Sequence, residues 1–297
     1  MERVLITGAA GLMGTQTTAL LSGRYALHGL DLKAGPADLT WFTGDITDAD
    51  LVHAAVKGCD AVVHIAAIPN IVSGTAADIM RINVTGTWNV YAAAQAAGAG
   101  KVVLCSSDSV VGFTVLAGQM IAPDYLPIDT SHPLRPTDPY ALSKKLGEEI
   151  ARSFTHHGIS TVAIRPVFIA HPESRIEIEA RARDPDTYVP GSAGGAQPAA
   201  GGAVWHHVHP RDVARAFALG LELDMAPGSF EAFFISSAVT LSPEPTLERL
   251  QRFLGGDLPP LRDPAIWETS PHAPLYDLRS AAQRLGFVAE FDVRDWT

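Results

Sequence analysis

The feature that most constrains the fold is a glycine-rich turn directly after the first apolar run of the chain. Residues 4–14 read VLITGAAGLMG, so Gly8, Gly11 and Gly14 follow a strand pattern and a helical pattern begins at Leu12. In a βα unit that binds a dinucleotide, the first glycine permits the tight turn. The second lets backbone N–H groups approach the pyrophosphate, and the third lets the helix pack against the strand. The position of this turn, at the start of the first βα unit, favours phosphate binding over an ordinary structural turn.

The first 165 residues alternate short apolar runs with longer helical patterns. The predicted strands are Val4–Thr7, Ala26–Leu30, Ala61–Ile65, Val102–Ser106 and Thr161–Ile164. The predicted helices between them are Leu12–Ser22, Ala49–Lys57, Asp78–Ala97 and Pro139–His156. Apolar strands between helices predict a parallel sheet covered on both faces, and right-handed crossovers make it doubly wound. We therefore predict an α/β fold of the Rossmann type.

The pattern changes after Arg165-Pro166. Residues 184–203 (DPDTYVPGSAGGAQPAAGGA) are rich in Pro, Gly and Ala and lack hydrophobic periodicity, which is typical of a lid loop or of a surface insertion. Helical patterns return at Asp212–Leu223, Thr246–Leu254 and Arg279–Leu285. We predict a nucleotide-binding domain at 1–165 and a smaller α/β substrate-binding portion at 166–297, interleaved as one globular unit.

Composition narrows the function classes. The chain has 297 residues, 47% hydrophobic residues and a formal net charge of −10. That charge argues against nucleic acid and against anionic membranes as partners. No apolar run approaches the roughly 18 residues of a spanning helix, and the N-terminus enters a strand without a signal-peptide pattern. With only two cysteines, Cys59 and Cys105, in apolar surroundings, we expect a cytoplasmic protein without disulfides.

An acidic residue ends the second predicted strand. Asp31 can accept hydrogen bonds from both ribose hydroxyls of a dinucleotide, and it would repel a 2′-phosphate, so we predict NAD over NADP. Because Lys33 lies nearby, NADP stays the alternative cofactor. Gly44-Asp45-Ile46 follows the third strand of such a fold, which falls before the run at Ala61–Ile65, and there Asp45 can meet the adenine amino group. The alternative for Asp45 is an N-cap of the helix that begins near Asp48.

A tyrosine and a lysine share one face of the helix expected at Pro139–His156. Tyr140 and Lys144 are four residues apart, so their side chains project from the same side. A nearby ammonium favours the tyrosinate and lowers the phenol pKa from about 10, so the tyrosine can exchange a proton near neutral pH. Ser107 directly follows the strand predicted at Val102–Ser106, the fifth of such a fold, at the sheet edge that faces the ligand, and can hydrogen-bond the reacting oxygen. This placement favours catalysis over a surface helix pair.

These motifs resemble the extended short-chain dehydrogenase/reductases, in the NAD-dependent epimerase/dehydratase group. The matching segments are TGAAGLMG (7–14), Asp31, GDI (44–46), HIAA (64–67), Asn83, SSDSVVG (106–112), YALSK (140–144), IRP (164–166) and HPRDVARAF (209–217). The glycine spacing, G-x-x-G-x-x-G, is that of short-chain enzymes. The stretch Ser106–Phe113 with residues 133–154, and the ribose segment 31–36, are most similar to uronate dehydrogenases, which oxidise a free sugar acid at C1 with NAD.

The resemblance implies roles for individual residues. The implied catalytic triad is Ser107, Tyr140 and Lys144. Asp31 would hold the adenosine ribose, Asn83 would support the cofactor-carrying helix, and Pro166 and Val167 would lie near the carboxamide. The full set expected at the NAD site is Gly8, Gly11, Leu12, Met13, Gly14, Asp31, Leu32, Asp45, Ile46, Ala66, Ala67, Ile68, Asn83, Cys105, Tyr140, Lys144, Pro166 and Val167.

Three departures from the family pattern narrow the reaction. Sugar dehydratases have an Asp-Glu pair after the catalytic hydroxyl residue, but here the pair is Asp108-Ser109. Nucleotide-sugar epimerases usually carry an asparagine after the strand ending at Arg165, and residues 166–169 contain none. Val111 replaces the family's usual tyrosine. Uronate dehydrogenases tend to have asparagine at the position of Asp108. Because an aspartate would repel a carboxylate, an uncharged sugar is an alternative substrate.

Several residues are candidates for contact with the substrate. Arg165 and Arg175 are placed to hold a carboxylate or phosphate, although a solvated surface role is favoured for Arg175. The full candidate set is Asn70, Ser73, Asp108, Ser109, Arg165, Phe168, Arg175 and His207. The run His206-His207-x-His209 has poor metal-ligand spacing and no completing carboxylate, so we expect no metal.

The sequence therefore predicts an NAD-dependent dehydrogenase that oxidises a hydroxyl or hemiacetal of a carbohydrate-like small molecule. The alternatives are an NAD-dependent sugar epimerase, which uses the same residues, and a non-catalytic NAD-sensing protein. The helices at Asp78–Ala97 and Tyr140 have apolar positions on more than one face. In the family these helices form a dimer contact, so we expect a homodimer, with intrachain burial as the competing explanation.

Overall fold

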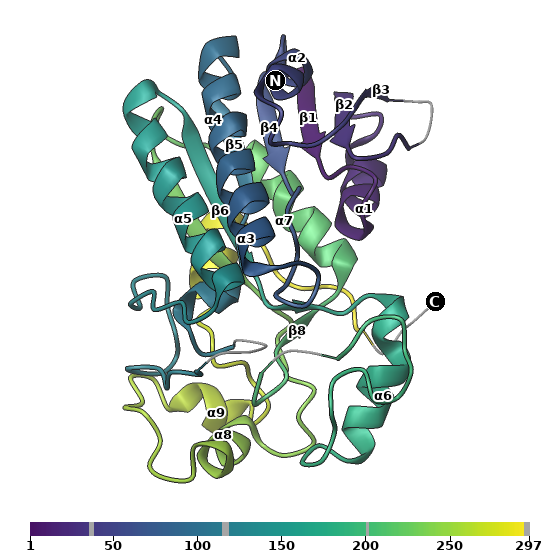
Figure 1. Ribbon diagram of the computed structural model, residues 1–297. Helices are drawn as coiled ribbons and strands as arrows, with labels where there is room; N and C mark the ends of the chain where they lie inside the picture. Colours follow the sequence, from purple (N-terminus) through teal and green to yellow (C-terminus); the bar gives the residue numbers. More distant parts are fainter. Residues whose placement is uncertain (36–38, 115–118, 200–201, 294–297) are drawn as a thin grey trace.

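Seven parallel strands form the centre of the computed structural model, which describes residues 1–35, 39–114, 119–199 and 202–293 (Figure 1). Their order is β3-β2-β1-β4-β5-β6-β9. The strands are β1 (Arg3–Thr7), β2 (Ala26–Asp31), β3 (Thr40–Thr43), β4 (Ala61–His64), β5 (Lys101–Cys105), β6 (Ser160–Pro166) and β9 (Phe230–Ile235). The order reverses between β1 and β4, and a crevice opens beyond the strand ends at such a switch point. The predicted Rossmann-type fold is confirmed.

Helices cover both faces of the sheet, as the apolar strands predicted (Figure 1). On one face lie α2 (Ala49–Val56), α4 (Gly86–Ala97) and α5 (Pro139–Phe154). On the other lie α1 (Leu12–Leu21) and α7 (Pro210–Glu222). Strand β6 is buried at every position, because both of its faces are covered. Within the described residues, no helix combines the length and the apolar composition needed to cross a bilayer.

The helix predicted at Asp78–Ala97 is three consecutive segments. It begins earlier, with α3 (Ala76–Ile79), continues as a π-helical turn η1 (Met80–Thr85), and ends as α4. Asn83 lies in the π turn, and its side chain bonds the backbone of Ile68, accepting from the N–H at 2.8 Å and donating to the carbonyl at 3.1 Å. It also donates to Ser143 Oγ at 2.9 Å. A π turn in an α-helix often marks a functional site, and here it ties the loop after β4 to α5.

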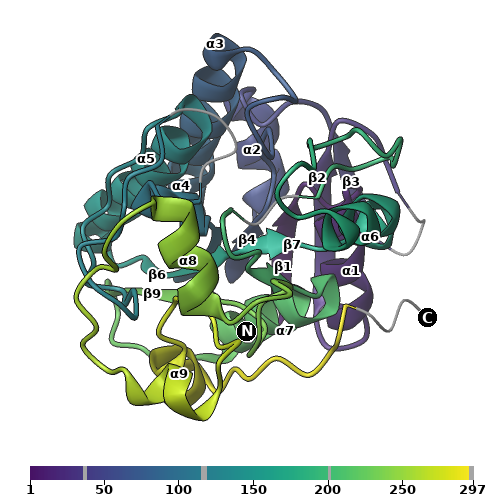
Figure 2. The same ribbon diagram turned by 90° about the horizontal axis from the view of Figure 1, so that it is seen from below.

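The rest of the chain lies beyond the carboxyl ends of the strands (Figures 1 and 2). Its elements are β7 (Phe168–Ile169), α6 (Arg175–Arg183), β8 (His207–Val208), α8 (Thr246–Leu254) and α9 (Ala265–Thr269). Short 3-10 or π turns are η2 (Asp108–Val111), η3 (Thr155–His157), η4 (Pro172–Ser174) and η5 (Ala281–Leu285). Strands β7 and β8 pair as a separate small sheet. The division at residue 165 stays a prediction, since α7 and β9 return to the main sheet.

Some elements were not predicted from the sequence, namely β7, β8, β9, α6 and α9. The missed β9 reads FEAFFI and pairs in parallel with β6 along its length. The segment predicted as a lid or insertion contains no helix or strand where it is described, at 184–199 and 202–203. Residues 200 and 201, like Pro36 of the ribose segment, lie outside the described residues. The role of this segment as a lid stays a prediction.

Candidate active site

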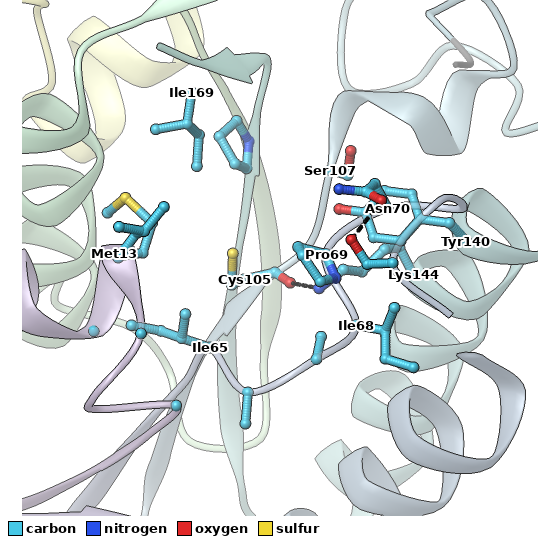
Figure 3. A pocket seen from close by; sticks show the side chains of 18 of the residues that line it. Met13, Ile65, Ile68, Pro69, Asn70, Cys105, Ser107, Tyr140, Lys144 and Ile169 are labelled. Carbon is cyan, nitrogen blue, oxygen red and sulfur yellow. Dashed lines mark hydrogen bonds between the residues drawn. The ribbon is translucent and has the colours of Figure 1, made fainter. Parts of the chain in front are cut away.

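A cavity of about 620 Å³ runs along the carboxyl edge of the sheet (Figure 3). It extends from the glycine turn after β1, past the ends of β2 and β4, to β5 and the start of α5. The predicted residues that line it are Gly8, Gly11, Leu12, Met13, Gly14, Asp31, Leu32, Asp45, Ile46, Ala66, Ala67, Ile68, Asn70, Ser73, Cys105, Ser107, Asp108, Ser109, Tyr140, Lys144, Pro166, Val167 and Phe168. Residues far apart in the sequence thus meet in one place.

The glycine turn at one end of the cavity leaves no room for a side chain at Gly8 or at Gly14. A Cβ on Gly14 would lie 1.9 Å from the carbonyl oxygen of Gly8, and one on Gly8 would lie 2.9 Å from the backbone of Ala66. Gly8 also has φ of +71°, a conformation that favours glycine. Helix α1 has Gly11 as N-cap and no side-chain cap, so its first N–H groups remain available to a ligand. This geometry fits a pyrophosphate.

Two aspartates line the same end of the cavity. Asp31 Oδ2 accepts a hydrogen bond from the backbone N–H of Ala10 at 3.0 Å, which fixes the carboxylate beside the glycine turn. Asp48 caps α2, accepting from the N–H groups of Asp50 and Leu51, each at 3.1 Å. The alternative of Asp45 as the cap is therefore wrong, and Asp45 lines the cavity.

The predicted catalytic residues lie together at the other end (Figure 3). Helix α5 begins at Pro139, and Asp138 caps it by accepting from the N–H of Ala141 at 2.8 Å, so Tyr140 and Lys144 lie in its first turns. Lys144 Nζ donates to the carbonyl oxygen of Cys105 at 2.7 Å. The same ammonium is 5.8 Å from the centre of the Tyr140 ring. The end of β5 thereby fixes the lysine beside the tyrosine.

The expected lowering of the Tyr140 pKa is wrong, because the net shift is a rise. Burial raises the pKa of Tyr140 well above its ordinary value, and the negative charges of Asp108 and Asp138 add to that rise. Burial also lowers the pKa of Lys144. The loss of hydration around the phenol is the largest cause of the rise, and a side-chain hydrogen bond with Ser107 opposes it. Tyr140 is therefore protonated at neutral pH.

Asp108 is a buried carboxylate at the substrate end. Its Oδ2 accepts hydrogen bonds from Thr114 Oγ1 and, at 2.9 Å, from Tyr276 Oη, and its Oδ1 accepts one from Ser107 Oγ at 3.3 Å. Burial raises the pKa of Asp108 to about 6, although these hydrogen bonds oppose the rise. Tyr276 belongs to the C-terminal portion, so that portion helps to fix a carboxylate next to the predicted catalytic serine.

The raised pKa of Asp108 predicts a pH-dependent stability. The folded chain binds a proton at Asp108 more tightly than the unfolded chain does. The stabilisation of the fold by this bound proton is therefore complete below pH about 4, and it is lost as pH rises through about 6. Asp108→Asn removes the titration, so its free energy of unfolding relative to the parent should rise by about 1.4 kcal/mol from pH 5 to pH 8. Urea unfolding at both pH values measures it. The exposed Asp257→Asn is the control, and equal behaviour of the two variants would contradict the assignment.

Four predicted residues are not brought to the cavity, namely Asn83, Arg165, Arg175 and His207. Asn83 lies behind its wall, bonded to Ile68 and Ser143 as described above. For Arg175 the favoured solvated surface role fits the structure and the placement near a substrate is wrong, because its guanidinium is half exposed on α6 and pairs with Glu179 at 2.8 Å. His207 is buried in β8.

Arg165 is also wrongly predicted to meet substrate, because it is committed to a buried ion pair. Its Nε and Nη2 donate to Glu148 Oε1 at 2.8 Å and Oε2 at 2.7 Å, and both side chains are at most 1% exposed. Ser106 Oγ donates to the same Glu148 Oε1 at 2.6 Å. The pair joins the ends of β5 and β6 to α5. Arg165 thus supports the wall of the site from behind.

The histidine run also has structural partners. His206 Nε2 accepts from the N–H of Leu275 at 3.0 Å, and His209 Nδ1 accepts from the N–H of Arg211 at 3.1 Å. Among the described residues, no three His, Cys, Asp or Glu side chains are grouped as metal ligands.

Sequence reasoning missed part of the cavity lining. The unpredicted residues are Leu30, Gly44, Ile65, Pro69, Ile71, Ile82, Ser106, Thr114, Asp138, Ile169, His171, Ser174, Gln197 and Pro198. Asp138 had a local signal, since an aspartate before a proline at the start of a helix is a typical N-cap. Gln197 and Pro198 had none, because they lie in the unpatterned segment that turns back over the site.

Comparison with known proteins agrees with this geometry. The sequence model of the NAD dependent epimerase/dehydratase family matches residues 4–233. A uronate dehydrogenase of Pseudomonas putida is 34% identical over 172 residues, covering 55% of this chain and 60% of that protein. An L-arabinose 1-dehydrogenase (NAD(P)(+)) of Haloferax volcanii is 32% identical over 171 residues, covering 56% and 66%. The chain thus spans about 60% of the length of the uronate dehydrogenases it matches.

Solved structures agree on the fold. MoeE5 in complex with UDP-glucuronic acid and NAD superposes with a TM-score of 0.70 and 23% identity, covering 99% of this chain and 95% of that one. The family match includes the glycine turn, the strand ends and the Tyr140 helix. The predicted resemblance is confirmed, and with it NAD as the cofactor: the chain belongs to the NAD-dependent epimerase/dehydratase family.

Proposed function

We propose that this chain is an NAD-dependent oxidoreductase that oxidises a hydroxyl or hemiacetal group of a sugar-like substrate. The observation that carries the proposal is a single cavity with Gly8, Gly14 and Asp31 at one end and Ser107 and Tyr140 at the other. The first end suits a dinucleotide and the second suits proton transfer. Relatives named as uronate and L-arabinose dehydrogenases support a sugar as the substrate.

In the proposed reaction Tyr140 is the base. After losing its own proton to solvent, its phenolate oxygen takes the proton of the substrate hydroxyl and becomes a phenol again. Ser107 Oγ holds the hydroxyl oxygen of the substrate by a hydrogen bond. Lys144, fixed by the carbonyl of Cys105, keeps a positive charge beside the phenolate before it takes up the proton. NAD, when bound, supplies the acceptor of the hydride. Since the pKa of Tyr140 is raised, oxidation should become faster as pH rises through the alkaline range.

The cofactor choice gives a prediction at Asp31. The carboxylate lies beside the glycine turn, where it would bond ribose hydroxyls and repel a 2′-phosphate. Asp31→Ala should reduce the ratio of kcat/KM for NAD to kcat/KM for NADP by about 10-fold or more, from the loss of a charged hydrogen bond. Initial rates with each cofactor measure it, with the N-cap substitution Asp48→Asn as the control. An unchanged ratio would show that Asp31 does not select the cofactor.

The reaction is tested with a panel of aldoses, uronic acids and nucleotide sugars, each incubated with NAD while NADH absorbance is followed. Free NADH that accumulates in proportion to one substrate supports oxidation. The second candidate, an epimerase, is favoured by the family description and would return the hydride, so it predicts isomerised sugar without net NADH. The absence of an asparagine in residues 166–169 argues against nucleotide-sugar epimerisation.

We also propose that the protein is a cytoplasmic homodimer. Trp88 on α4 is 52% exposed and Leu142 on α5 is 40% exposed, and these two helices pack side by side. Exposed apolar side chains on adjacent helices suit contact with the same helices of a second copy. Sedimentation of the purified chain would give its mass in solution.

A further inference from the structure

The end of the cavity that holds Tyr140 is acidic. The carboxylates that line the whole cavity are Asp31, Asp45, Asp108 and Asp138. Asp108 and Asp138 both lie close enough to Tyr140 to raise the pKa of its phenol. Among the described lining residues Lys144 is the single Lys or Arg, and its ammonium is bound to the carbonyl of Cys105. His171 also lines the cavity, and burial lowers its pKa, so it is neutral at pH 7.

The two arginines predicted to hold an anion pair with other carboxylates. Arg165 is buried in its pair with Glu148, and Arg175 pairs with Glu179 on the outer side of α6. Recognition of a carboxylate or phosphate usually requires an arginine fork or an ammonium. A substrate anion at this end would therefore face two carboxylates and only the lysine that serves the tyrosine.

The same end is instead rich in groups that bond hydroxyls. Asp138 is 7% exposed, and its Oδ1 caps α5 while its buried Oδ2 has no partner among the described residues. Ser109 is 4% exposed, and its Oγ also has no such partner. Asp108 is held by Thr114 and Tyr276 with its carboxylate in the lining. Carboxylates only accept hydrogen bonds, and a hydroxyl both donates and accepts.

We propose, on the basis of the proposed oxidation, that Asp108 and Asp138 select an uncharged polyhydroxylated substrate, a neutral sugar, and exclude sugars that carry a carboxylate or phosphate. Hydroxyl groups of the substrate donate to these carboxylates and to the free oxygen of Ser109. The carboxylate or phosphate group of an anionic sugar offers these aspartates neither a hydrogen-bond donor nor a positive charge. Like charges in a partly desolvated cavity repel strongly.

Matched pairs of sugars test this selection. D-galactose and D-galacturonate, like D-glucose and D-glucuronate, present the same hemiacetal and differ by a hydroxymethyl or a carboxylate at C6. We expect kcat/KM with NAD to be about 100-fold or more higher for the neutral member of a pair. Equal or better oxidation of the uronates would overturn the selection and leave the oxidation standing. No NADH from any member would overturn the proposed function and this inference together.

Two substitutions link the selection to the named carboxylates. Asparagine caps helices as well as aspartate does, so Asp138→Asn keeps the start of α5 and replaces the free acceptor by a donor. Asp138→Asn and Asp108→Asn should each lower the neutral-to-uronate ratio of kcat/KM by about 10-fold or more, because each removes a repelling charge. Asp257→Asn, which removes an exposed charge that does not line the cavity, should leave the ratio unchanged. If neither variant changes the neutral-to-uronate ratio of kcat/KM, the assignment of the selection to Asp108 and Asp138 is overturned. If one variant fails to fold, the ratio in the other decides.

Discussion

Tyr140→Phe should reduce turnover by about 1000-fold and leave NAD binding nearly unchanged. The substitution removes one oxygen atom, and general acid–base groups typically contribute 100-fold to 10,000-fold in rate. The ring stays in place because Asp138 still caps α5 and Lys144 still donates to Cys105. The glycine turn and Asp31 lie at the other end of the cavity, so the affinity for NAD should change little. Steady-state oxidation and NAD titration by fluorescence measure the two quantities.

A pH profile separates a catalytic role from a structural one. If Tyr140 is the base, kcat/KM for oxidation in the parent chain should rise about 10-fold per pH unit below its pKa, since only the phenolate accepts a proton. The residual rate of Tyr140→Phe should lack this rise. Tyr25→Phe, which removes a phenol oxygen far from the cavity, is the control and should keep both rate and profile. Full activity in Tyr140→Phe would show that another group moves the proton.

The parts of the fold that the sequence predicted are those with local physical signals. The turn at Gly8, Gly11 and Gly14 follows an apolar strand, and backbone sterics permit no larger residue at two of these positions. The Pro139 helix begins at a typical cap, and its 3.6-residue repeat places Tyr140 and Lys144 on one face. Because carboxyl ends of parallel strands share an edge, the expected meeting of these residues with Ser107 followed from topology alone.

The sequence predictions that failed concern residues whose partners lie elsewhere in the chain. Arg165 at the end of a strand resembles a ligand-binding arginine until its pairing with Glu148, 17 residues earlier, is known. Strand β9 was missed because the segment FEAFFI is too short to distinguish from a helix turn without its pairing to β6. The pKa of Tyr140 depended on a balance of burial and charge that sequence spacing does not give. Cavity-lining residues such as Thr114 and Gln197 come from loops without periodicity.

Glu148→Gln should lower the free energy of unfolding by about 3–5 kcal/mol. Glu148 and Arg165 are at most 1% exposed, and the carboxylate accepts from two guanidinium nitrogens and from Ser106. Loss of the negative charge leaves the guanidinium buried without a counter-charge. Glu149→Gln, at the exposed neighbouring position of α5, should change the stability by less than about 0.5 kcal/mol. Urea unfolding followed by circular dichroism compares the two.

The double substitution Glu148→Met with Arg165→Met shows where that energy comes from. A buried ion pair gains from attraction but loses the hydration of both charges, and replacement of both partners by apolar groups is often neutral or stabilising. We expect the double variant to recover most of the stability that Glu148→Gln loses, because no unpaired charge remains. Should the double variant be as unstable as the single one, the pair would be net stabilising through its own hydrogen bonds. In either case Ser106 loses its partner, so the edge of the cavity beside Ser107 should loosen and turnover should fall more than the affinity for NAD.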